Sequence, residues 1–144
     1  MSRRGNVILE FALSFGLLFS VFAGVFQFGH TFFLYNNLQS AVRAGARYAS
    51  IETYESGSAT PTSAYLAAVR NVVLYGDPAG GSTPRLPGLR PEHIQVSVTM
   101  DRGVPREITV AIDGYRIDAV VGSLTLNGKP RVTMPYMGRF APPV

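Results

Sequence analysis

The chain has no cysteine and no tryptophan, and only two of its 144 residues are histidine. Without cysteine there are no disulfide bonds and no thiolate metal sites, so a folded part must be held by packing and hydrogen bonds. A Gly-x-Ser-x-Gly nucleophile motif is also missing, and the glycine-rich segment 79–83 lacks the lysine of a phosphate-binding loop. We therefore expect no enzyme activity, no small-molecule substrate, no cofactor and no metal site.

The two histidines do not change this expectation. His30 lies in an apolar segment without a second ligand at a suitable spacing, so a hydrogen-bonded or water-facing imidazole is favoured over a metal ligand. His93 precedes a predicted strand and is expected at the surface. The net charge of +4 is a weak indication of nucleic-acid binding, because it includes Arg3 and Arg4 at the extreme N-terminus.

Formal charge is missing from one long stretch, since residues 11–42 contain no Asp, Glu, Lys or Arg. About 20 apolar residues, rising about 1.5 Å each, are enough to cross a hydrocarbon layer of about 30 Å. The stretch predicts a single membrane-spanning helix. Arg3 and Arg4 precede it, and basic residues tend to remain on the cytoplasmic side. We expect a single pass through the inner membrane, with a cytoplasmic N-terminus and the remainder outside.

A cleaved secretory signal is the competing interpretation of this N-terminus. Such signals have an apolar core of about 7 to 15 residues. Here the apolar segment continues through Tyr35 and passes into an amphipathic pattern without a break, so cleavage there would cut a helix. The pattern favours a retained helix.

The predicted organisation has three parts: a basic leader at 1–5, a long helix at 6–52 and an extracytoplasmic head at 53–144. The helix contains no proline, and its outer half is amphipathic. One face of that outer half is expected to lie under the head. Its small and apolar members are Leu38, Ala41, Val42, Gly45, Ala46 and Ala49.

The head combines a short helix with strands. The helix is predicted to begin near Thr60 and Pro61 and to end at Tyr75 and Gly76, followed by a surface loop rich in glycine and proline. Alternating apolar residues predict strands, whereas one later segment suits either a strand or a helix. The fold class is α+β, a long N-terminal hydrophobic helix with a small head containing a short helix and an antiparallel sheet. The predicted strands are 94–101, 108–112 and 131–134, with a turn at 101–106 and the ambiguous segment at 115–126.

Two stripes follow the apolar half of the helix. Ala12, Gly16, Ser20 and Gly24 recur every four residues and form a small-residue ridge, which allows helices to approach closely in lipid. Phenylalanines lie on an adjacent face. The alternative interpretation is that the two stripes have no role in assembly, because membrane helices are commonly rich in Phe and Gly. The phenylalanines of this face are Phe11, Phe15, Phe19, Phe22, Phe26 and Phe33.

Glu10 is the one carboxylate at the edge of the apolar stretch. A charge inside hydrocarbon costs roughly 2.5 to 3.5 kcal/mol on insertion scales, so a partner is expected. If Gly5 ends a removed leader, the new amine of Asn6 could pair with Glu10 between neighbouring subunits. The alternative is that Glu10 interacts with the amino end of its own helix, which is worth about 0.3 to 1 kcal/mol.

Three segments carry a resemblance to a known family. The start of the chain, with its basic leader, Gly5 and Glu10, resembles a class III signal. Residues 5–11, 27–29 and 41–49 resemble the TadE-like family of the tight-adherence (Tad) branch of type IV pilin-like proteins, with weaker similarity at 73–76 and 134–140. The resemblance implies cleavage between Gly5 and Asn6 by a prepilin peptidase, N-methylation of Asn6, and an assembly role for Glu10. Members of the family are usually minor pilins or pseudopilins.

Three functions remain open on the sequence. The favoured one is a structural pilin-like subunit that leaves the membrane to form a Tad-type filament or its tip, with itself or with other pilins, for adhesion at the cell surface. The second is a permanent single-pass component of a pilus assembly or secretion machine. The third, disfavoured, is a DNA-binding or host-binding module using Arg43, Arg47 and Arg70. The predicted assembly residues are Glu10, Phe11, Ala12, Gly16, Ser20 and Gly24.

The third function would include aromatic stacking on nucleic acid, because tyrosines occur near these arginines. Packing inside the head is the favoured role of the tyrosines. They are Tyr48, Tyr54, Tyr65 and Tyr75.

Overall fold

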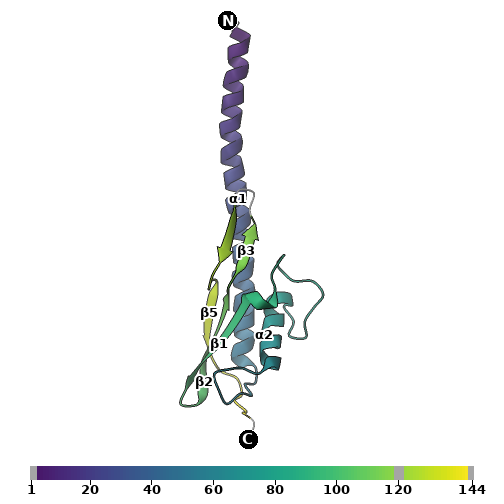
Figure 1. The fold of residues 1–144 in the computed structure, drawn as a ribbon, viewed down its shortest axis with the longest axis vertical. Helices are drawn as coiled ribbons and strands as arrows, with labels where there is room; N and C mark the ends of the chain where they lie inside the picture. Colours follow the sequence, from purple (N-terminus) through teal and green to yellow (C-terminus); the bar gives the residue numbers. More distant parts are fainter. Residues whose placement is uncertain (1–2, 119–121, 143–144) are drawn as a thin grey trace.

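The computed structural model describes residues 3–118 and 122–142. Its dominant element is α1, Arg3–Ile51, a single helix of 49 residues that contains no proline. Figure 1 shows that the N-terminal half of α1 stands free, whereas its C-terminal half carries a head. The predicted α+β class is confirmed, with a long apolar helix, a second short helix and antiparallel sheets.

Within the residues that the structure describes, the head contains α2 and five strands. The helix α2 spans Ser63–Tyr75 and packs against α1, and a 3-10 turn, η1, spans Pro91–His93. The main sheet has the strand order β1-β2-β5, and its neighbouring strands are antiparallel. The strands are β1 Ile94–Asp101, β2 Val104–Ile112, β3 Tyr115–Asp118, β4 Ser123–Leu126 and β5 Arg131–Pro135.

The sheet differs from the prediction in two respects. The turn between β1 and β2 is tighter than expected, because Arg102 and Gly103 both have positive φ and β2 already begins at Val104. The ambiguous segment after Tyr115 forms two strands, and β3 and β4 pair only with each other as a separate antiparallel hairpin. The expectation of one sheet was therefore incomplete.

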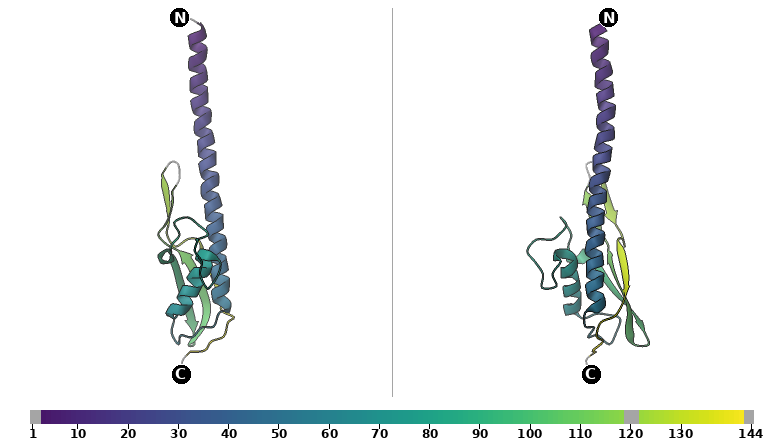
Figure 2. Two further views of the ribbon diagram at one scale, coloured as in Figure 1. Left: turned by 90° about the vertical axis from the view of Figure 1, so that its right-hand side faces the viewer. Right: turned by 180° about the vertical axis from the view of Figure 1, so that it is seen from behind.

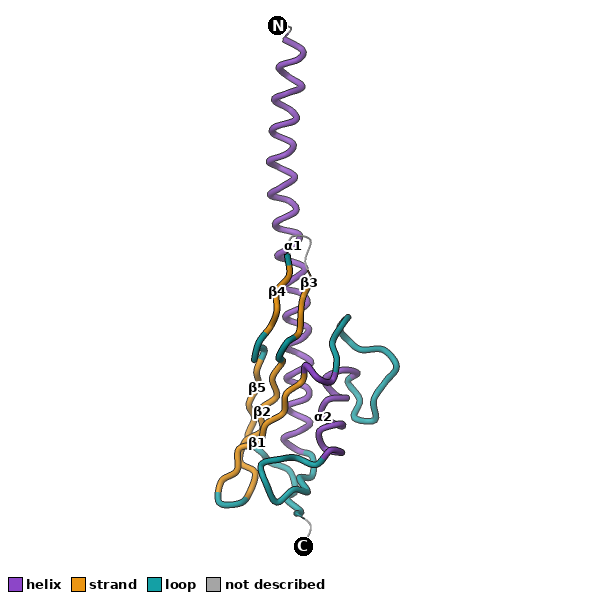
Figure 3. The backbone as a smooth tube through the Cα atoms, in the orientation of Figure 1, coloured by secondary structure: helices purple, strands orange, loops and turns teal. Residues whose placement is uncertain are grey.

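The hairpin β3–β4 extends beyond the main sheet. Figures 2 and 3 show it running beside α1 toward the free half of the helix, away from the C-terminus. Its residues Tyr115, Ile117 and Leu126 belong to the core of the head and are at most 8% exposed. Burial of these side chains holds the hairpin against the rest of the protein.

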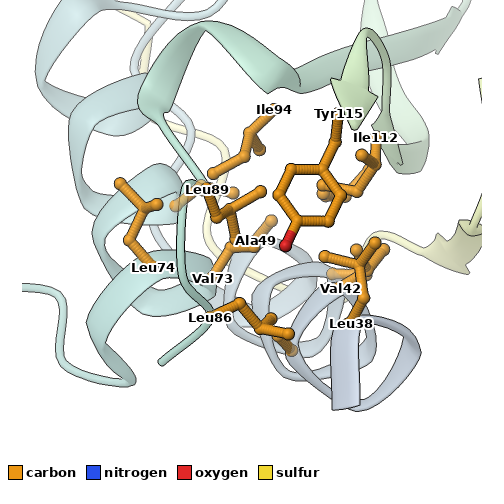
Figure 4. Packing of buried hydrophobic residues seen from close by; sticks show 14 of the residues in the cluster. Leu38, Val42, Ala49, Val73, Leu74, Leu86, Leu89, Ile94, Ile112 and Tyr115 are labelled. Atoms are coloured by element: carbon orange, nitrogen blue, oxygen red, sulfur yellow. The ribbon is translucent and has the colours of Figure 1, made fainter. Parts of the chain in front are cut away.

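The core lies between α1, α2 and the main sheet. All six outer-half residues predicted to lie under the head are buried, which confirms the amphipathic pattern. The helices approach tightly at Gly45, where a Cβ would collide with Val73 Cγ2. Figure 4 shows residues of α1, α2, β1 and β2 converging on this core. They include Leu38, Val42, Ala49, Val73, Leu74, Ile94 and Ile112.

The boundaries of α2 follow from its caps. The Thr62 side chain accepts a hydrogen bond from the Tyr65 amide at 3.3 Å, as an N-cap residue does. Gly76 ends the helix at φ 85° and donates its amide to the carbonyl of Val72 at 2.9 Å, a left-handed conformation that glycine adopts without a steric penalty. The helix thus begins slightly later than the predicted start at Thr60.

The C-terminal end of α1 is locked by groups from the head. A helix leaves its last carbonyls without partners in the helix itself. The Tyr65 hydroxyl donates to the Ala49 carbonyl at 2.5 Å, and the Met137 amide donates to the Ser50 carbonyl at 2.8 Å. The free half of α1 therefore projects from a firmly held base.

We expect the head to lose stability at alkaline pH because of its tyrosines. Burial raises the pKa of Tyr54, Tyr65, Tyr115 and Tyr136 above 10.0. A raised pKa of the folded state stabilises the fold below the unfolded pKa, and the contribution is lost as pH rises beyond it. Thermal unfolding in detergent should show the midpoint falling above about pH 10. A midpoint that stays constant there would contradict this assignment.

Candidate assembly surface

All predicted assembly residues lie on the free half of α1. From Asn6 to Phe22 every side chain is exposed, and Phe11 is 69% exposed. By length and composition, the segment Asn6–Ile51 could span a membrane, and none of its most apolar window is buried by the rest of the protein. The helix therefore presents a hydrophobic surface that the described part of the chain does not cover.

The small-residue ridge is open along its length. A Cβ placed on Gly16 or Gly24 would meet nothing within 4 Å. Ser20 donates its hydroxyl to the Gly16 carbonyl at 2.8 Å, so the one polar side chain of the ridge is satisfied by its own helix. Another helix could approach this surface without leaving that hydroxyl unpaired.

The aromatic face beside the ridge is ordered by stacking along the helix. The ring centroids of Phe11 and Phe15 are 6.1 Å apart, and those of Phe15 and Phe19 are 6.2 Å apart. Phe28 and Phe32 form a further stacked pair at 6.4 Å. These spacings are those of aromatic pairs one helical turn apart. The rings thus form two apolar stacks, Phe11 to Phe19 beside the ridge and Phe28 to Phe32 beyond its end, available to a neighbouring helix or to lipid.

Glu10 is exposed and lies outside the ion pairs recorded among the described residues. Those pairs belong to the head: Arg90 with Glu92, Arg106 with Asp101, and Arg116 with Asp118. Among the side chains that the structure describes, from Asn6 onward, none of opposite charge pairs with Glu10. Another molecule or a newly formed terminus could supply a partner in an apolar environment.

The predicted cleavage point lies within α1. Gly5 and Asn6 are both helical, and Asn6 is exposed. Asn6 precedes Glu10 by four residues, which in a helix is about one turn. A terminus created at Asn6 would therefore lie on nearly the same face of the helix as the carboxylate, about 6 Å away along the axis.

The arginines considered for DNA binding are not brought together. Arg43 and Arg47 line a groove of ≈ 460 Å³ along α1. Arg70, in α2, instead donates its Nε hydrogen to the Ile94 carbonyl at 3.4 Å. Since Gly45 faces α2, Arg47 lies roughly 200° around the helix from it, on the other side. No common basic surface joins the three side chains.

The tyrosines are occupied by packing in the head, as favoured from the sequence. Tyr54 and Tyr65 are 1% and 5% exposed, and their rings meet edge to face at 5.5 Å. Tyr48 and Tyr75 are partly buried against the same core. The two deeply buried rings cannot stack on a base.

The histidines also lie apart from the assembly surface and from each other. His30 is exposed on α1. His93 is partly buried beside Tyr115, with ring centroids 5.8 Å apart, and its Nδ1 accepts a hydrogen bond from the Arg90 amide at 3.2 Å. Within residues 3–118 and 122–142, no group of three or more His, Cys, Asp or Glu side chains is arranged to hold a metal ion.

Two features of the surface were missed from the sequence. The groove beside Arg43 and Arg47 shows that one face of the outer half of α1 is uncovered, and Ile51 in that groove is 57% exposed. The spacing of Ser40, Arg43 and Arg47 along the helix is the sequence signal that could have indicated this uncovered face. The second is a groove where Leu124 of β4 meets the free half of α1, for which the sequence carries no signal.

Leucine on the ridge should weaken helix association. Gly16→Leu and Gly24→Leu fill open space that a second helix would need, and overpacking typically costs about 1 to 3 kcal/mol. A free-energy change of about 1.4 kcal/mol alters an equilibrium constant tenfold. We therefore expect the amount of the chain recovered from sheared surface fibres to fall about tenfold or more. Gly29→Leu is the matched control, because a Cβ there also meets nothing within 4 Å and Gly29 lies off the ridge. Equal yields from all three variants would indicate that lipid alone faces the ridge.

Comparison with known proteins places a family match on this same helix. The model of the family described as TadE-like protein matches residues 5–47, which include every predicted assembly residue and the Gly5–Asn6 bond. The chain matched neither a curated protein nor a solved structure. Over the long helix the chain is therefore similar to TadE-like proteins, as the sequence resemblance predicted, and this similarity indicates a Tad pilus-associated component.

Proposed function

We propose that the protein is a pilin-like structural subunit that assembles through α1 into a Tad-type pilus or its tip. The observation that carries the proposal is the free half of α1, where an uncovered apolar surface surrounds Glu10, which has no ion-pair partner among the side chains described from Asn6 onward. Copies of the chain or other pilin subunits supply the covering surface. The head is then presented outward for adhesion or subunit contacts.

Helix packing provides the physical basis for assembly. Before assembly, the apolar surface of α1 lies in the inner membrane, with the N-terminus cytoplasmic and the head outside. In the filament, the same surface is buried against neighbouring helices, and the ridge through Gly16 and Gly24 sets how closely they approach. Exchange of lipid for protein keeps the phenylalanines out of water in both states.

Glu10 gives the packing its register. A prepilin peptidase cleaves after Gly5, and the amine of Asn6 on one subunit pairs with Glu10 of another. In a low-dielectric core such a pair is sensitive to loss of either partner, at about 3 to 5 kcal/mol. The proposal is supported by the exposure of both residues and by the family match that covers them.

The second candidate is a permanent single-pass component of the pilus machine. The same observations favour it, because an apolar helix with an open ridge also suits contacts within the membrane. The two functions differ in whether the chain leaves the bilayer and loses its leader.

Mass spectrometry of sheared surface appendages separates these functions. The filament subunit should be recovered from purified appendages with Asn6 as its first residue. A chain that begins at Met1, or that stays entirely in the membrane fraction while appendages are abundant, would contradict the proposal and favour the machine component.

A further inference from the structure

The β3–β4 hairpin reaches the free half of α1. Leu124, at the second position of β4, lines a groove of ≈ 700 Å³ together with residues of the helix. Figures 2 and 3 show β3 and β4 beside α1, well below the free N-terminus and beyond the main sheet. The helix residues in the groove are Phe19, Ser20, Ala23, Gly24, Gln27, Phe28 and Thr31.

The level of this groove coincides with the outer boundary of a bilayer. A hydrocarbon layer of about 30 Å takes about 20 residues of helix. Counted from Asn6, the layer ends near Phe26, and counted from Glu10 it ends near His30. Both counts place the outer boundary within the part of α1 that lines the groove with Leu124.

The side chains of the hairpin are arranged for such a boundary. Ile117, the pairing partner of Leu124, is 1% exposed in the core, whereas Leu124 itself is 49% exposed. The exposed charges of β3 are paired, since Arg116 Nε lies 2.8 Å from Asp118 Oδ1. α1 presents no charged residue between Glu10 and Arg43. The groove is therefore uncharged, and its lining is mostly apolar apart from Ser20, Gln27 and Thr31, at the depth where lipid chains meet headgroups.

We propose that the β3–β4 hairpin is a second membrane contact that rests on the outer leaflet before assembly. Leu124 enters the lipid, and acyl chains fill the groove beside Gly24. The hairpin thereby fixes the depth of α1 and covers part of the ridge with lipid, which neighbouring helices displace on assembly. This contact depends on the membrane span and not on filament formation, so it can fail or hold separately from the proposed function.

Single tryptophans can test the contact, because the chain has none of its own. Leu124→Trp is compared with Val104→Trp, a matched apolar position at the start of β2 that is 46% exposed and lies at the far end of the head. Each full-length variant is reconstituted at low protein density into phosphatidylcholine vesicles, with and without brominated acyl chains. Bromine quenches tryptophan only at close range, so the readout reports contact with lipid chains.

Leu124→Trp should emit at shorter wavelength than Val104→Trp and lose at least half of its intensity in brominated vesicles, while Val104→Trp keeps nearly all of it. Equal quenching of the two variants, or none, would overturn the proposal. Leu124→Trp that stays shielded from bromine at a high ratio of lipid to protein would also overturn it, because something other than lipid, such as a second copy of the chain, would then be the occupant.

A second probe covers the case in which Leu124→Trp misfolds. Ser123 is exposed, and the chain has no cysteine, so Ser123→Cys can carry a single environment-sensitive dye. The dye should report an apolar surrounding in phosphatidylcholine vesicles, and the same dye on Val104→Cys should report water. A water-like signal from both positions contradicts a leaflet contact.

Discussion

Glu10→Ala should abolish incorporation into surface filaments while leaving membrane insertion intact. The change removes a charge whose insertion costs roughly 2.5 to 3.5 kcal/mol, so the helix enters the bilayer at least as well. In the filament, the Asn6 amine loses its partner, and an unpaired buried charge costs about 3 to 5 kcal/mol. That corresponds to a fall of roughly 100-fold or more in the chain recovered from sheared filaments.

The control for this variant is Glu55→Ala, which removes an exposed carboxylate from the head and should leave the yield unchanged. The competing role of Glu10, interaction with the amino end of its own helix, is worth about 0.3 to 1 kcal/mol and predicts a loss of less than about tenfold. Quantitative immunoblots of membrane and sheared fractions distinguish the two. Normal filament yield from Glu10→Ala would rule out the intersubunit pair.

Gly45→Leu should separate the head from α1. A single Cβ at Gly45 already collides with Val73 Cγ2, and leucine adds three further carbons at this contact between α1 and α2. Overpacking typically costs about 1 to 3 kcal/mol, and we expect the upper end, about 3 kcal/mol, because the collision involves a core valine that is fully buried. The thermal midpoint in detergent should fall accordingly, with faster proteolysis of the head.

The matched comparison is again Gly29→Leu, which replaces a glycine of the same helix in open space. Both substitutions gain about the same helix propensity, so the difference between them reports the packing against Val73. A melting point for Gly45→Leu equal to that of Gly29→Leu would show that α2 can move away without loss. In that case the described contact would not hold the head on the helix.

The helices follow directly from local patterns in the sequence. The charge-free run and the lack of proline predict a continuous α1, and the spacing of Leu38, Val42 and Ala46 predicts the face that the head covers. Strand pairing could not be predicted in the same way. Alternation identifies β1 and β2, but the detachment of β3–β4 from the main sheet depends on tertiary packing of Tyr115 and Ile117.

The assembly surface was partly predictable for a similar reason. Helical geometry alone places Gly16, Ser20 and Gly24 along a continuous stripe, with Glu10 beyond its N-terminal end along the axis but roughly 200° around the helix from Ala12. The partner of Glu10 is not visible in one chain if it belongs to another subunit. The groove at Leu124 was not predictable, because it joins a strand of the head to helix residues far away in the sequence.

The central claim is that the Asn6 amine of one subunit meets Glu10 of the next. A zero-length carbodiimide cross-linker joins an amine to a carboxylate only when the two are in contact. Applied to sheared filaments grown from mixed light and isotopically heavy chains, it should yield a peptide linking light Asn6 to heavy Glu10, visible by mass spectrometry. Links only within chains of one isotope, or an unreacted Glu10 beside a free Asn6 terminus, would contradict the claim.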